Sequence, residues 1–368
     1  MLNNRRSQLI IFFLLLTPVL AAARLFYRVN SSNSDPLFNN DNELISNISR
    51  RRKPEILGKG KLKGPEDILH DEKSGVIYTG CRDGWIKRVK PGNSAKDTVV
   101  ENWVNTGGRP LGLSWMHGTK EMIVADAYKG LLKIEENGKI RVLTEEANGK
   151  KFKLTDGVTV AKDGKIYFTD ASSKYNMKNF MLDIFEGKPN GRLLSYDPKT
   201  SETLLLASGL YFPNGVALSP NQDFLVFCET PERRCRQYYI EGERKGSVEN
   251  FIELPTMPDN IHFKDGHFWI AAAMVTFYFL FSYQLMISGK KNNKFKKNGY
   301  FLPEAATKMG KKKREKGRVY VVNLEGKVSK TYSGTALKLV ASGVKIGNYL
   351  YCGSIFNYHI VRLPLSHG

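Results

Sequence analysis

Short apolar stretches recur along this chain, and each is followed by a polar turn and a second apolar stretch. The clearest case is LYFPNGVALSPNQDFLVFCE at residues 210–229, where Asn214 directly precedes one strand and residues 220–223 form the turn to the next. Apolar residues alternate or cluster on both sides of these turns, as they do in half-buried antiparallel hairpins. The pattern therefore predicts a β-hairpin.

The same hairpin pattern occurs six times. Its equivalent apolar points are Ile68, Leu113, Val158, Val216, Ile261 and Val344. They lie 45, 45, 58, 45 and 83 residues apart. A period near 45 residues made of short strands indicates a β-propeller, because one four-stranded sheet cannot bury both of its faces alone. Six copies predict an all-β fold, a six-bladed β-propeller over residues 53–366.

A strand for closing the ring is expected just before the first copy. The segment KPEILGKGKLK at residues 53–63 has strand character. A propeller needs its first and last blades joined, and a strand from one terminus added to the blade from the other achieves this. We predict that Glu55 to Leu57 pair beside His359 to Leu363, with an extended linker as the alternative.

Composition and charge agree with one closed domain. The chain has 368 residues, 41% of them hydrophobic, which is enough to bury a large core. Its formal net charge of +20 would ordinarily suggest a nucleic acid partner. Half of that excess lies in residues 289–318, where twelve Lys or Arg accompany two Glu. A solvated loop explains such a run, so we expect no nucleic acid partner.

The N-terminal residues have the pattern of a targeting segment. Arg5 and Arg6 precede an apolar run from Leu9 to Ala23 that ends in small residues. This predicts a signal peptide or signal anchor over residues 1–27 and entry into the secretory pathway, with the propeller on the lumenal side of the endoplasmic reticulum or vacuole. If the segment is not cleaved, it tethers the protein to the membrane.

Residues 28–52 are rich in Asn and Ser, then basic, and are predicted to be a linker because they lack a strand pattern. Within them, Asn30-Ser31-Ser32 and Asn47-Ile48-Ser49 match the N-glycosylation tripeptide. Asn30 and Asn47 are therefore candidate glycosylation sites.

Four cysteines lie in a compartment that permits disulfides. Cys228 and Cys235 flank a predicted hairpin turn and could face each other, while Cys81 and Cys352 belong to blades that are neighbours in a ring. Spacing alone does not supply the Cα separation that a disulfide requires. We therefore expect buried free thiols.

One apolar run, residues 268–287, contains no charged residue and is long enough for a transmembrane helix. It begins within the second strand of the fifth blade, however, so a span here would separate two parts of one ring by a membrane. We predict instead an irregular lid and basic insertion over residues 271–317, with a patch resting on the bilayer as the alternative.

Several motifs, in order along the chain, resemble the plant strictosidine-synthase-like proteins. They are GPEDI at Gly64, GGRPLGL at Gly107, LTDGV at Leu154, FPNGVALS at Phe212, MPDNI at Met257 and SGVKIGNYLYCGS at Ser342. The chain is also similar to adipocyte plasma membrane-associated protein and, more distantly, to paraoxonases and gluconolactonases. The resemblance implies a six-bladed propeller but leaves the reaction open, because one fold hosts several chemistries.

The hydrolase relatives imply a calcium ion at the centre of the propeller, held at the starts of the inner strands. Carried over by position, its ligands are Glu66, Asn214, Asp259 and Asn260. Thr155 fills the position of a further ligand, so Asp156 beside it either substitutes for that ligand or supports the site from outside. Independently of the resemblance, acidic or amide residues begin four copies, and oxygen donors suit Ca²⁺. The same residue types also cap turns.

The strictosidine synthase reaction, which the resemblance implies as a condensation of tryptamine with secologanin, depends on a glutamate in the last blade. Ala341 or Ser342 falls at that position, and residues 339–353 contain no carboxylate. Without a titratable group in reach, this condensation is not expected. The two histidines that paraoxonases place above the calcium correspond to Pro110 and Ala127.

Three functions remain open. We prefer a calcium-dependent esterase or lactonase-type hydrolase of small organic esters, in which the metal polarises the carbonyl and activates a bound water. Asp259 or Asp156 is then the catalytic base, and Arg109 binds a polar substrate unless it is purely structural. The alternatives are a condensing lyase of strictosidine synthase type and a non-catalytic lumenal binding propeller. The expected partners are a small-molecule substrate and, through an uncleaved N-terminus, a membrane.

Overall fold

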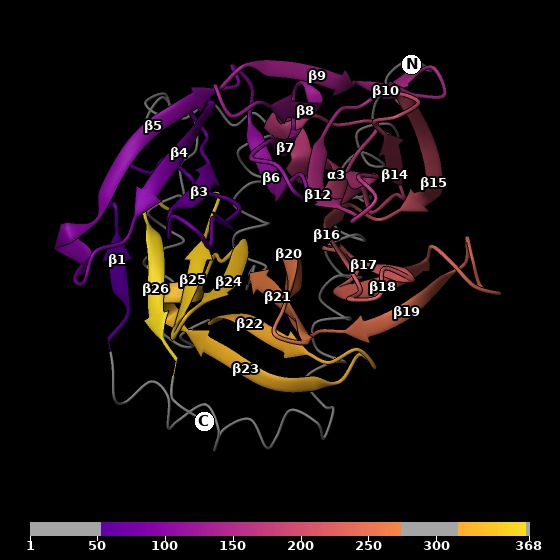
Figure 1. Ribbon diagram of the computed structural model, residues 1–368. Helices are drawn as coiled ribbons and strands as arrows, with labels where there is room; N and C mark the ends of the chain where they lie inside the picture. Colours follow the sequence, from indigo (N-terminus) through magenta and orange to yellow (C-terminus); the bar gives the residue numbers. More distant parts are fainter. Residues whose placement is uncertain (1–52, 274–315, 366–368) are drawn as a thin grey trace, which may run out of the picture.

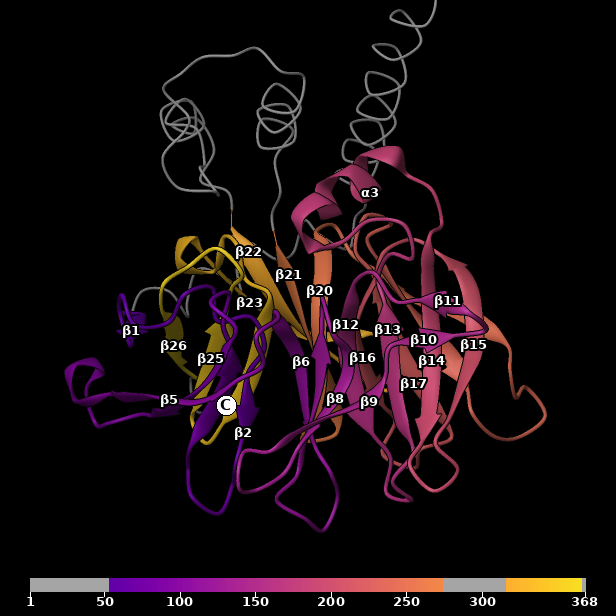
Figure 2. The same cartoon turned by 90° about the horizontal axis from the view of Figure 1, so that it is seen from above.

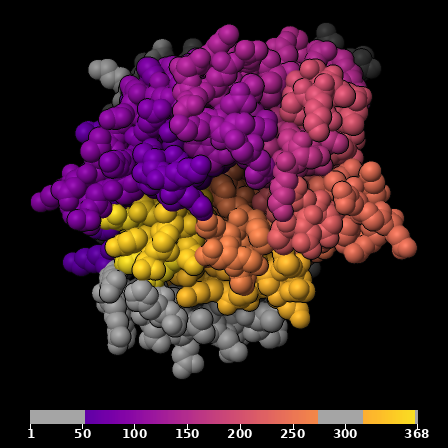
Figure 3. Space-filling view, in the orientation of Figure 1, coloured from indigo at the N-terminus to yellow at the C-terminus, as the bar shows by residue number. Residues whose placement is uncertain are grey.

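The computed structural model describes residues 53–273 and 316–365, which form six four-stranded antiparallel sheets in a ring (Figure 1). Except in the sheet that contains the N-terminal strand, the first strand of each sheet lies near the centre of the ring and the last lies at the rim; the N-terminal strand itself lies at the rim. In Figure 3 the blades follow one another around the ring, and the indigo N-terminal blade meets the yellow C-terminal blade. The predicted six-bladed β-propeller is confirmed.

The strands of the first three blades follow the chain in order. Blade 1 consists of β2 (Leu69–His70), β3 (Ile77–Gly80), β4 (Trp85–Lys90) and β5 (Val99–Asn105). Blade 2 consists of β6 (Pro110–Trp115), β7 (Met122–Asp126), β8 (Gly130–Ile134) and β9 (Ile140–Thr144). Blade 3 consists of β12 (Thr155–Val160), β13 (Ile166–Asp170), β14 (Gly191–Asp197) and β15 (Glu202–Leu210).

The other three blades complete the ring. Blade 4 consists of β16 (Pro213–Leu218), β17 (Phe224–Glu229), β18 (Arg234–Tyr239) and β19 (Val248–Glu253). Blade 5 consists of β20 (Met257–Lys264), β21 (His267–Ala273), β22 (Gly317–Val322) and β23 (Val328–Gly334). Blade 6 consists of β24 (Ser342–Ile346), β25 (Tyr349–Gly353), β26 (Ile360–Pro364) and β1 (Glu55–Leu57).

Short elements lie between these strands. They are the hairpin of β10 (Glu146–Ala147) and β11 (Lys150–Lys151), the 3₁₀ helices η3 (Ala95–Asp97), η4 (Met177–Asn179) and η6 (Thr335–Leu337), and the α-helix α3 (Phe180–Glu186). Figure 2 shows α3 at one end of the propeller, beyond the inner strands.

The ring is closed by the N-terminal strand, as predicted. β1 pairs antiparallel with β26, and Ile56 lies opposite Val361. Leu57 and Ile360 are both completely buried and pack against Ile68 and Ile77 of blade 1. The extended-linker alternative for residues 53–63 is therefore wrong for residues 55–57.

The hydrophobic core is divided among the contacts between neighbouring blades. A separate cluster of buried residues lies between each adjacent pair, including the pair of blades 6 and 1 that closes the ring. Between blades 4 and 5, for example, Val226 packs with Phe268 and Ile270. Each side chain of this size contributes on the order of 1.5–3 kcal/mol when buried. Each sheet thus covers both faces only when both of its neighbours are in place.

The inner strands share an irregularity that sets up the centre of the ring. In blades 2 to 5 the pairing of the first strand with the second shifts register at the same place, as between Thr155 and Val158. The residue two places before each equivalent apolar point is here called the ring position. Across the six blades it is occupied by Glu66, Leu111, Asp156, Asn214, Asp259 and Ser342.

Glycines next to the ring positions let the inner strands approach each other closely. A Cβ atom on Gly157 would lie 2.5 Å from the carbonyl oxygen of Asn214, and one on Gly215 would lie 2.6 Å from the Cα of Asn260. Any side chain at these places would push neighbouring blades apart. The glycines therefore keep the centre narrow enough for ring positions of different blades to face one space.

A buried carboxylate ends the second strand of blades 2, 3 and 4. These residues are Asp126, Asp170 and Glu229. Asp170 accepts hydrogen bonds from the backbone N–H groups of Lys153 and Leu154 at 3.1 and 3.0 Å. Arg192 donates to the same carboxylate from Nε and Nη2 at 3.0 and 2.7 Å. Each such carboxylate fixes the loop that leads into the inner strand, a role that the sequence analysis missed.

The expectation of four free thiols is wrong for one pair. Cys228 and Cys235 lie directly opposite each other on β17 and β18 and form a disulfide. The hairpin register supplies the short Cα separation that spacing alone did not guarantee. Cys81 and Cys352 are buried and free, as expected.

Several predictions concern residues that lie outside the described ranges. They are the signal segment (1–27), the linker (28–52) with Asn30 and Asn47, and residues 274–315 of the lid and basic insertion. The predicted bounds of that insertion are wrong at both ends, because residues 271–273 belong to β21 and residue 317 begins β22. Among residues 53–273 and 316–365, no helix has the length and apolarity to cross a membrane.

Candidate functional site

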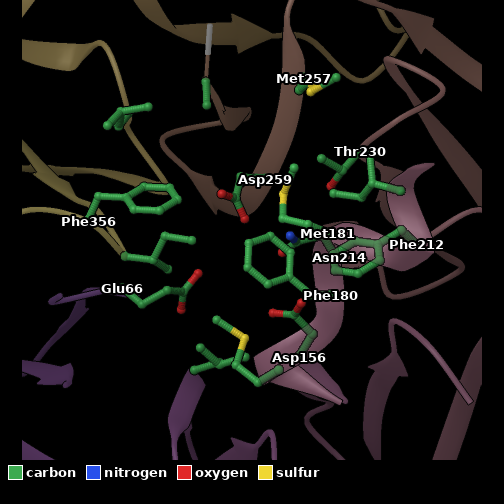
Figure 4. A pocket seen from close by; sticks show the side chains of 16 residues that line it. Glu66, Asp156, Phe180, Met181, Phe212, Asn214, Thr230, Met257, Asp259 and Phe356 are labelled. Atoms are coloured by element: carbon green, nitrogen blue, oxygen red, sulfur yellow. The ribbon is translucent and has the colours of Figure 1, made fainter. Parts of the chain in front are cut away.

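A cavity lies at the end of the ring where the inner strands begin. Its floor carries the ring-position residues of four blades, Glu66, Asp156, Asn214 and Asp259. Figure 4 shows the carboxylates of Glu66, Asp156 and Asp259 directed toward a common centre, with the ring of Phe180 across it. Three carboxyl groups and one amide from separate blades thus share one small space.

Burial raises the pKa of all three floor carboxyls. Burial, with the charge of Asp259 as the second cause, holds the pKa of Glu66 well above its usual value. The pKa of Asp259 is also raised well above its usual value, by burial and then by the charge of Asp156. Burial raises the pKa of Asp156 to about 7. Three such groups together favour either bound protons or a cation at neutral pH.

Two oxygens on the floor are buried without a hydrogen-bond partner among the described residues, Oε2 of Glu66 and Oδ1 of Asn214. The amide of Asn214 hydrogen-bonds to the carboxylate of Asp259. This leaves the amide oxygen of Asn214 as a free acceptor. Unpartnered buried acceptors are rare in folded proteins and call for an unobserved ligand or water.

The walls of the cavity are apolar. Residues from α3 and the 3₁₀ helix η4 before it form one side, and residues from the strands and loops of blades 2, 4, 5 and 6 form the rest. The larger wall residues are Leu111, Met177, Phe180, Met181, Ile184, Phe212, Met257, Leu339, Ile355 and Phe356. Polar groups on the floor and apolar groups above it are the usual composition of a small-molecule site.

Comparison with known proteins places this chain among its relatives. The family model described as strictosidine synthase matches residues 156–243, and the one described as strictosidine synthase-like, N-terminal, matches residues 52–89. Strictosidine synthase-like protein 6 of Arabidopsis thaliana is 52% identical over 319 residues, which are 84% of this chain and 81% of that protein. The chain belongs to the strictosidine synthase-like family.

Animal proteins also resemble this strictosidine synthase-like protein. Adipocyte plasma membrane-associated protein of Gallus gallus is 34% identical over 338 residues, covering 87% of this chain and 80% of that protein. The resemblance inferred from the motifs GPEDI, LTDGV, FPNGVALS and MPDNI is therefore confirmed.

Two solved structures share the propeller at low sequence identity. A gluconolactonase from Xanthomonas campestris matches with a TM-score of 0.58 at 15% identity, covering 84% of this chain and 88% of that one. The calcium-binding protein regucalcin from Agrobacterium tumefaciens matches with a TM-score of 0.55 at 12% identity, covering 85% and 97%. At these identities the likeness establishes the fold alone.

The predicted ligand Asn260 stands behind the floor of this strictosidine synthase-like site. It does not line the cavity, and its side-chain amide donates a hydrogen bond to Oε1 of Glu66. Thr155 likewise does not line the cavity, whereas Asp156 does. The alternative that Asp156 only supports the site from outside therefore has the weaker geometry, and Asn260 has the geometry of a residue that orients Glu66.

Arg109, the predicted substrate-binding residue, is not among the residues that line the cavity. Only 2% of its surface is exposed, and its guanidinium donates to the carbonyl oxygens of Gly64 and Gly80 at 3.0 and 3.3 Å. These contacts join the first two blades. The geometry agrees with the structural alternative that the sequence analysis left open.

A second polar cluster, which the sequence analysis missed, joins blades 1, 2, 5 and 6. Oδ1 of Asp67 accepts a hydrogen bond from the hydroxyl of Ser342 at 2.9 Å and lies 2.8 Å from Nε2 of His262. Its other oxygen accepts from the backbone N–H of Leu113. Burial alone would raise the pKa of Asp67, but His262 together with the backbone N–H groups of Leu113 and Ile68 outweighs burial and lowers it. Ser342 thus ties blades together where the synthase resemblance implied a catalytic acid.

The floor residues suit a hard cation by donor type. Carboxylate and amide oxygens are the ligands that Ca²⁺ takes. Glu66 and Asn214 each present an unpartnered oxygen, and they line the cavity together with Asp259. Within the described residues, however, no three His, Cys, Asp or Glu side chains form a compact metal-binding group. The donor set fits calcium, while its side chains are not gathered into a finished coordination shell.

The raised pKa values predict how stability depends on pH when a chelator removes any metal. A carboxyl with a raised pKa in the folded state stabilises the fold at low pH, and this stability is lost as pH rises through the folded value. For Asp156 the loss falls between about 4 and 7 and is on the order of a few kcal/mol. Thermal unfolding in EDTA should therefore show a lower Tm at pH 8 than at pH 5.

The Asp156→Asn variant is the control for this prediction. It removes the carboxyl without changing the size of the side chain, so the fall in Tm between pH 5 and pH 8 should become smaller. An equal fall in both proteins would contradict the role given to Asp156.

Proposed function

We propose that this protein is a calcium-dependent hydrolase of small carboxylic esters. The observation that carries the proposal is the convergence of Glu66, Asp156, Asn214 and Asp259 from four blades on one apolar-walled cavity. One side-chain oxygen each of Glu66 and Asn214 is buried without a hydrogen-bond partner, and a bound cation would satisfy both oxygens. The named activities of the gluconolactonase and of regucalcin agree with this proposal only at the level of the shared fold.

Each floor residue has a distinct part in the proposed reaction. Glu66, Asn214 and Asp259 would hold the calcium ion, and Asn260 would orient Glu66. Bound calcium supplies a positive charge that stabilises negative charge developing on an ester carbonyl oxygen. The apolar walls keep bulk water away, which strengthens every electrostatic interaction on the floor.

Asp156 is the residue that we assign as general base. Burial raises the pKa of Asp156, which makes its carboxylate a better proton acceptor, and none of the proposed calcium contacts uses this carboxylate. Asp156 takes a proton from the attacking water as the new bond between oxygen and carbonyl carbon forms. The ester C–O bond then breaks, and Asp156 returns the proton to the leaving alkoxide, so the products are a carboxylic acid and an alcohol. Asp259, the other candidate base, is better suited to the cation. The hydrogen bond from Asn214 favours the charged form of this carboxyl, and the charged form is the one that binds a cation.

We further propose that the propeller acts on the lumenal side of the secretory pathway, in the endoplasmic reticulum or vacuole. The apolar N-terminal run with its flanking arginines supports this placement. A relative whose name describes association with the plasma membrane is compatible with it.

The proposal is tested by measuring metal content and ester turnover together. Purified protein is expected to retain about one calcium ion per chain after dialysis. It should hydrolyse phenyl acetate, and the activity should be lost in EDTA and restored by calcium. Asn214→Ala should lose both properties, because it removes a donor and the hydrogen bond to Asp259. The matched control Asn250→Ala, on an exposed outer strand, should keep both.

Other outcomes point to other functions. Condensation of an amine with an aldehyde, without ester hydrolysis, would replace the proposal by a lyase of strictosidine synthase type. Neither reaction, with calcium absent from the purified protein, would leave a binding propeller.

A further inference from the structure

We propose that the substrate of this site carries an apolar acyl or alcohol group without hydroxyl groups, and that α3 is the element that selects it. This inference rests on the proposed hydrolase function and adds a substrate class to it. It separates this protein from hydrolases of sugar lactones, whose substrates bear several hydroxyl groups.

The distribution of polar atoms around the cavity carries the inference. Apart from the four floor residues, Thr230 is the one described lining residue with a polar side chain. Its hydroxyl already donates to the carbonyl oxygen of Pro258 at 2.8 Å. A substrate hydroxyl placed against these walls would lose its hydrogen bonds to water without replacement, which costs on the order of 1–3 kcal/mol for each group.

The wall formed by α3 and the preceding turn has a helical pattern. Met177, Phe180, Met181 and Ile184 are spaced as i, i+3, i+4 and i+7, so they share one face. This face packs over buried Leu111 of β6 and over buried Leu154 and Phe212, which directly precede β12 and β16. The rings of Phe180 and Phe212 lie 6.3 Å apart between centroids. One continuous apolar surface therefore runs from the helix to the floor.

Specific contacts hold α3 in this orientation. The side chain of Asn176 accepts a hydrogen bond from the N–H of Lys178 at the start of the helical segment. Gly187, with φ of 59°, ends the helix in the left-handed conformation that glycine favours. Asp183 accepts hydrogen bonds from Ser172 and Asn190, at 2.5 and 3.0 Å. Asp183 is therefore a positioning residue that ties the helix back to its own blade, and the apolar face is presented in a fixed place.

The experiment compares turnover of two aryl esters and one sugar lactone by the full protein with calcium. The probes are p-nitrophenyl acetate, p-nitrophenyl hexanoate and glucono-1,5-lactone. Burial of each added methylene should raise kcat/KM about fourfold until the wall is filled, so hexanoate should exceed acetate by more than tenfold. Gluconolactone should be hydrolysed more slowly than either ester.

Two variants assign this preference to the helix. Phe180→Ala should lower the ratio of kcat/KM for hexanoate over acetate about tenfold, because it removes apolar contact area from the wall. Met177→Gln should lower the same ratio while keeping the side-chain volume. Phe185→Ala and Leu182→Gln are the matched controls on α3, since neither residue lines the cavity, and both should keep the wild-type ratio.

A binding measurement separates this inference from the proposed hydrolase function. Isothermal titration with 2-pentanone and 2-nonanone, which resemble the esters but are not hydrolysed, should show tighter binding of the longer ketone, and Phe180→Ala should remove the difference. This result without ester turnover would support the apolar site and reject the hydrolase. Ester turnover without chain-length preference, or with gluconolactone as the best substrate, would overturn the inference and leave the hydrolase intact.

Discussion

Replacing Asp259 by Asn is expected to abolish calcium retention and to lower kcat/KM for phenyl acetate by on the order of 10³-fold. Asn keeps the size of the side chain but removes the charge, so the cavity should keep its shape. At the same time, the metal-free variant should be more stable than the metal-free wild type. Burial and the charge of Asp156 raise the pKa of Asp259, so removing the carboxyl relieves an unfavourable ionisation.

The variant is thus expected to lose calcium and ester turnover but to gain stability in the absence of metal. Metal analysis after dialysis, initial rates with phenyl acetate and thermal unfolding in EDTA at pH 8 measure them. Asp163→Asn, in an exposed turn, is the matched control and should change none of the three. An Asp259→Asn protein that keeps its calcium and turnover would remove Asp259 from the site. One that unfolds at a lower temperature in EDTA would show that the carboxylate stabilises the fold without metal.

The Asp170→Ala variant is expected to lose about 3–5 kcal/mol of unfolding free energy. The substitution leaves the guanidinium of Arg192 buried, with 5% of its residue surface exposed and without its carboxylate partner. It also removes the acceptor for two backbone N–H groups, those of Lys153 and Leu154. The loop into the inner strand that bears Asp156 would lose its anchor, so urea unfolding should show a lower midpoint.

Glu136→Ala provides the comparison for this effect. It breaks the ion pair with Lys120, in which the two side chains are 66% and 76% exposed, and it should cost less than about 1 kcal/mol. Replacing both partners, as in Asp170→Leu with Arg192→Met, should recover much of the loss because no buried charge remains. Equal midpoints for Asp170→Ala and Glu136→Ala would refute the anchoring role.

Much of the fold could be predicted from the sequence because the blades are repeated copies. The recurring hairpin pattern identified all six equivalent points, three of whose five spacings are 45 residues, and the strand at Glu55 to Leu57 was predicted from the need to close the ring. The floor residues Glu66, Asn214 and Asp259 were carried over by position from the family resemblance and, independently, stood out as acidic or amide residues at the starts of the copies. Each of these inferences uses local order along the chain, which a repeat preserves.

The rest depends on contacts between distant residues, and no local spacing encodes them. The side chain of His262 contacts those of Asp67 and Ser342, which lie far from it along the chain. Nothing next to His262 in the sequence therefore indicated these partners. The disulfide between Cys228 and Cys235 required the register of the hairpin. The wall formed by α3 did leave a signal, since Met177, Phe180, Met181 and Ile184 have helical spacing inside a sequence otherwise made of strands.

The pairing of β1 with β26 also determines the order in which the protein can be completed during synthesis. Residues 55–57 form the first described strand to leave the ribosome, and β26 is the last. β1 therefore has no partner until translation has nearly reached residue 364. During that interval the buried side chains of Leu57 and Ile68 have only one neighbour blade to cover them. Until β26 is made, the apolar faces at the two open ends of the ring stay exposed to solvent. We expect chaperones to bind these faces until the last strand pairs with β1.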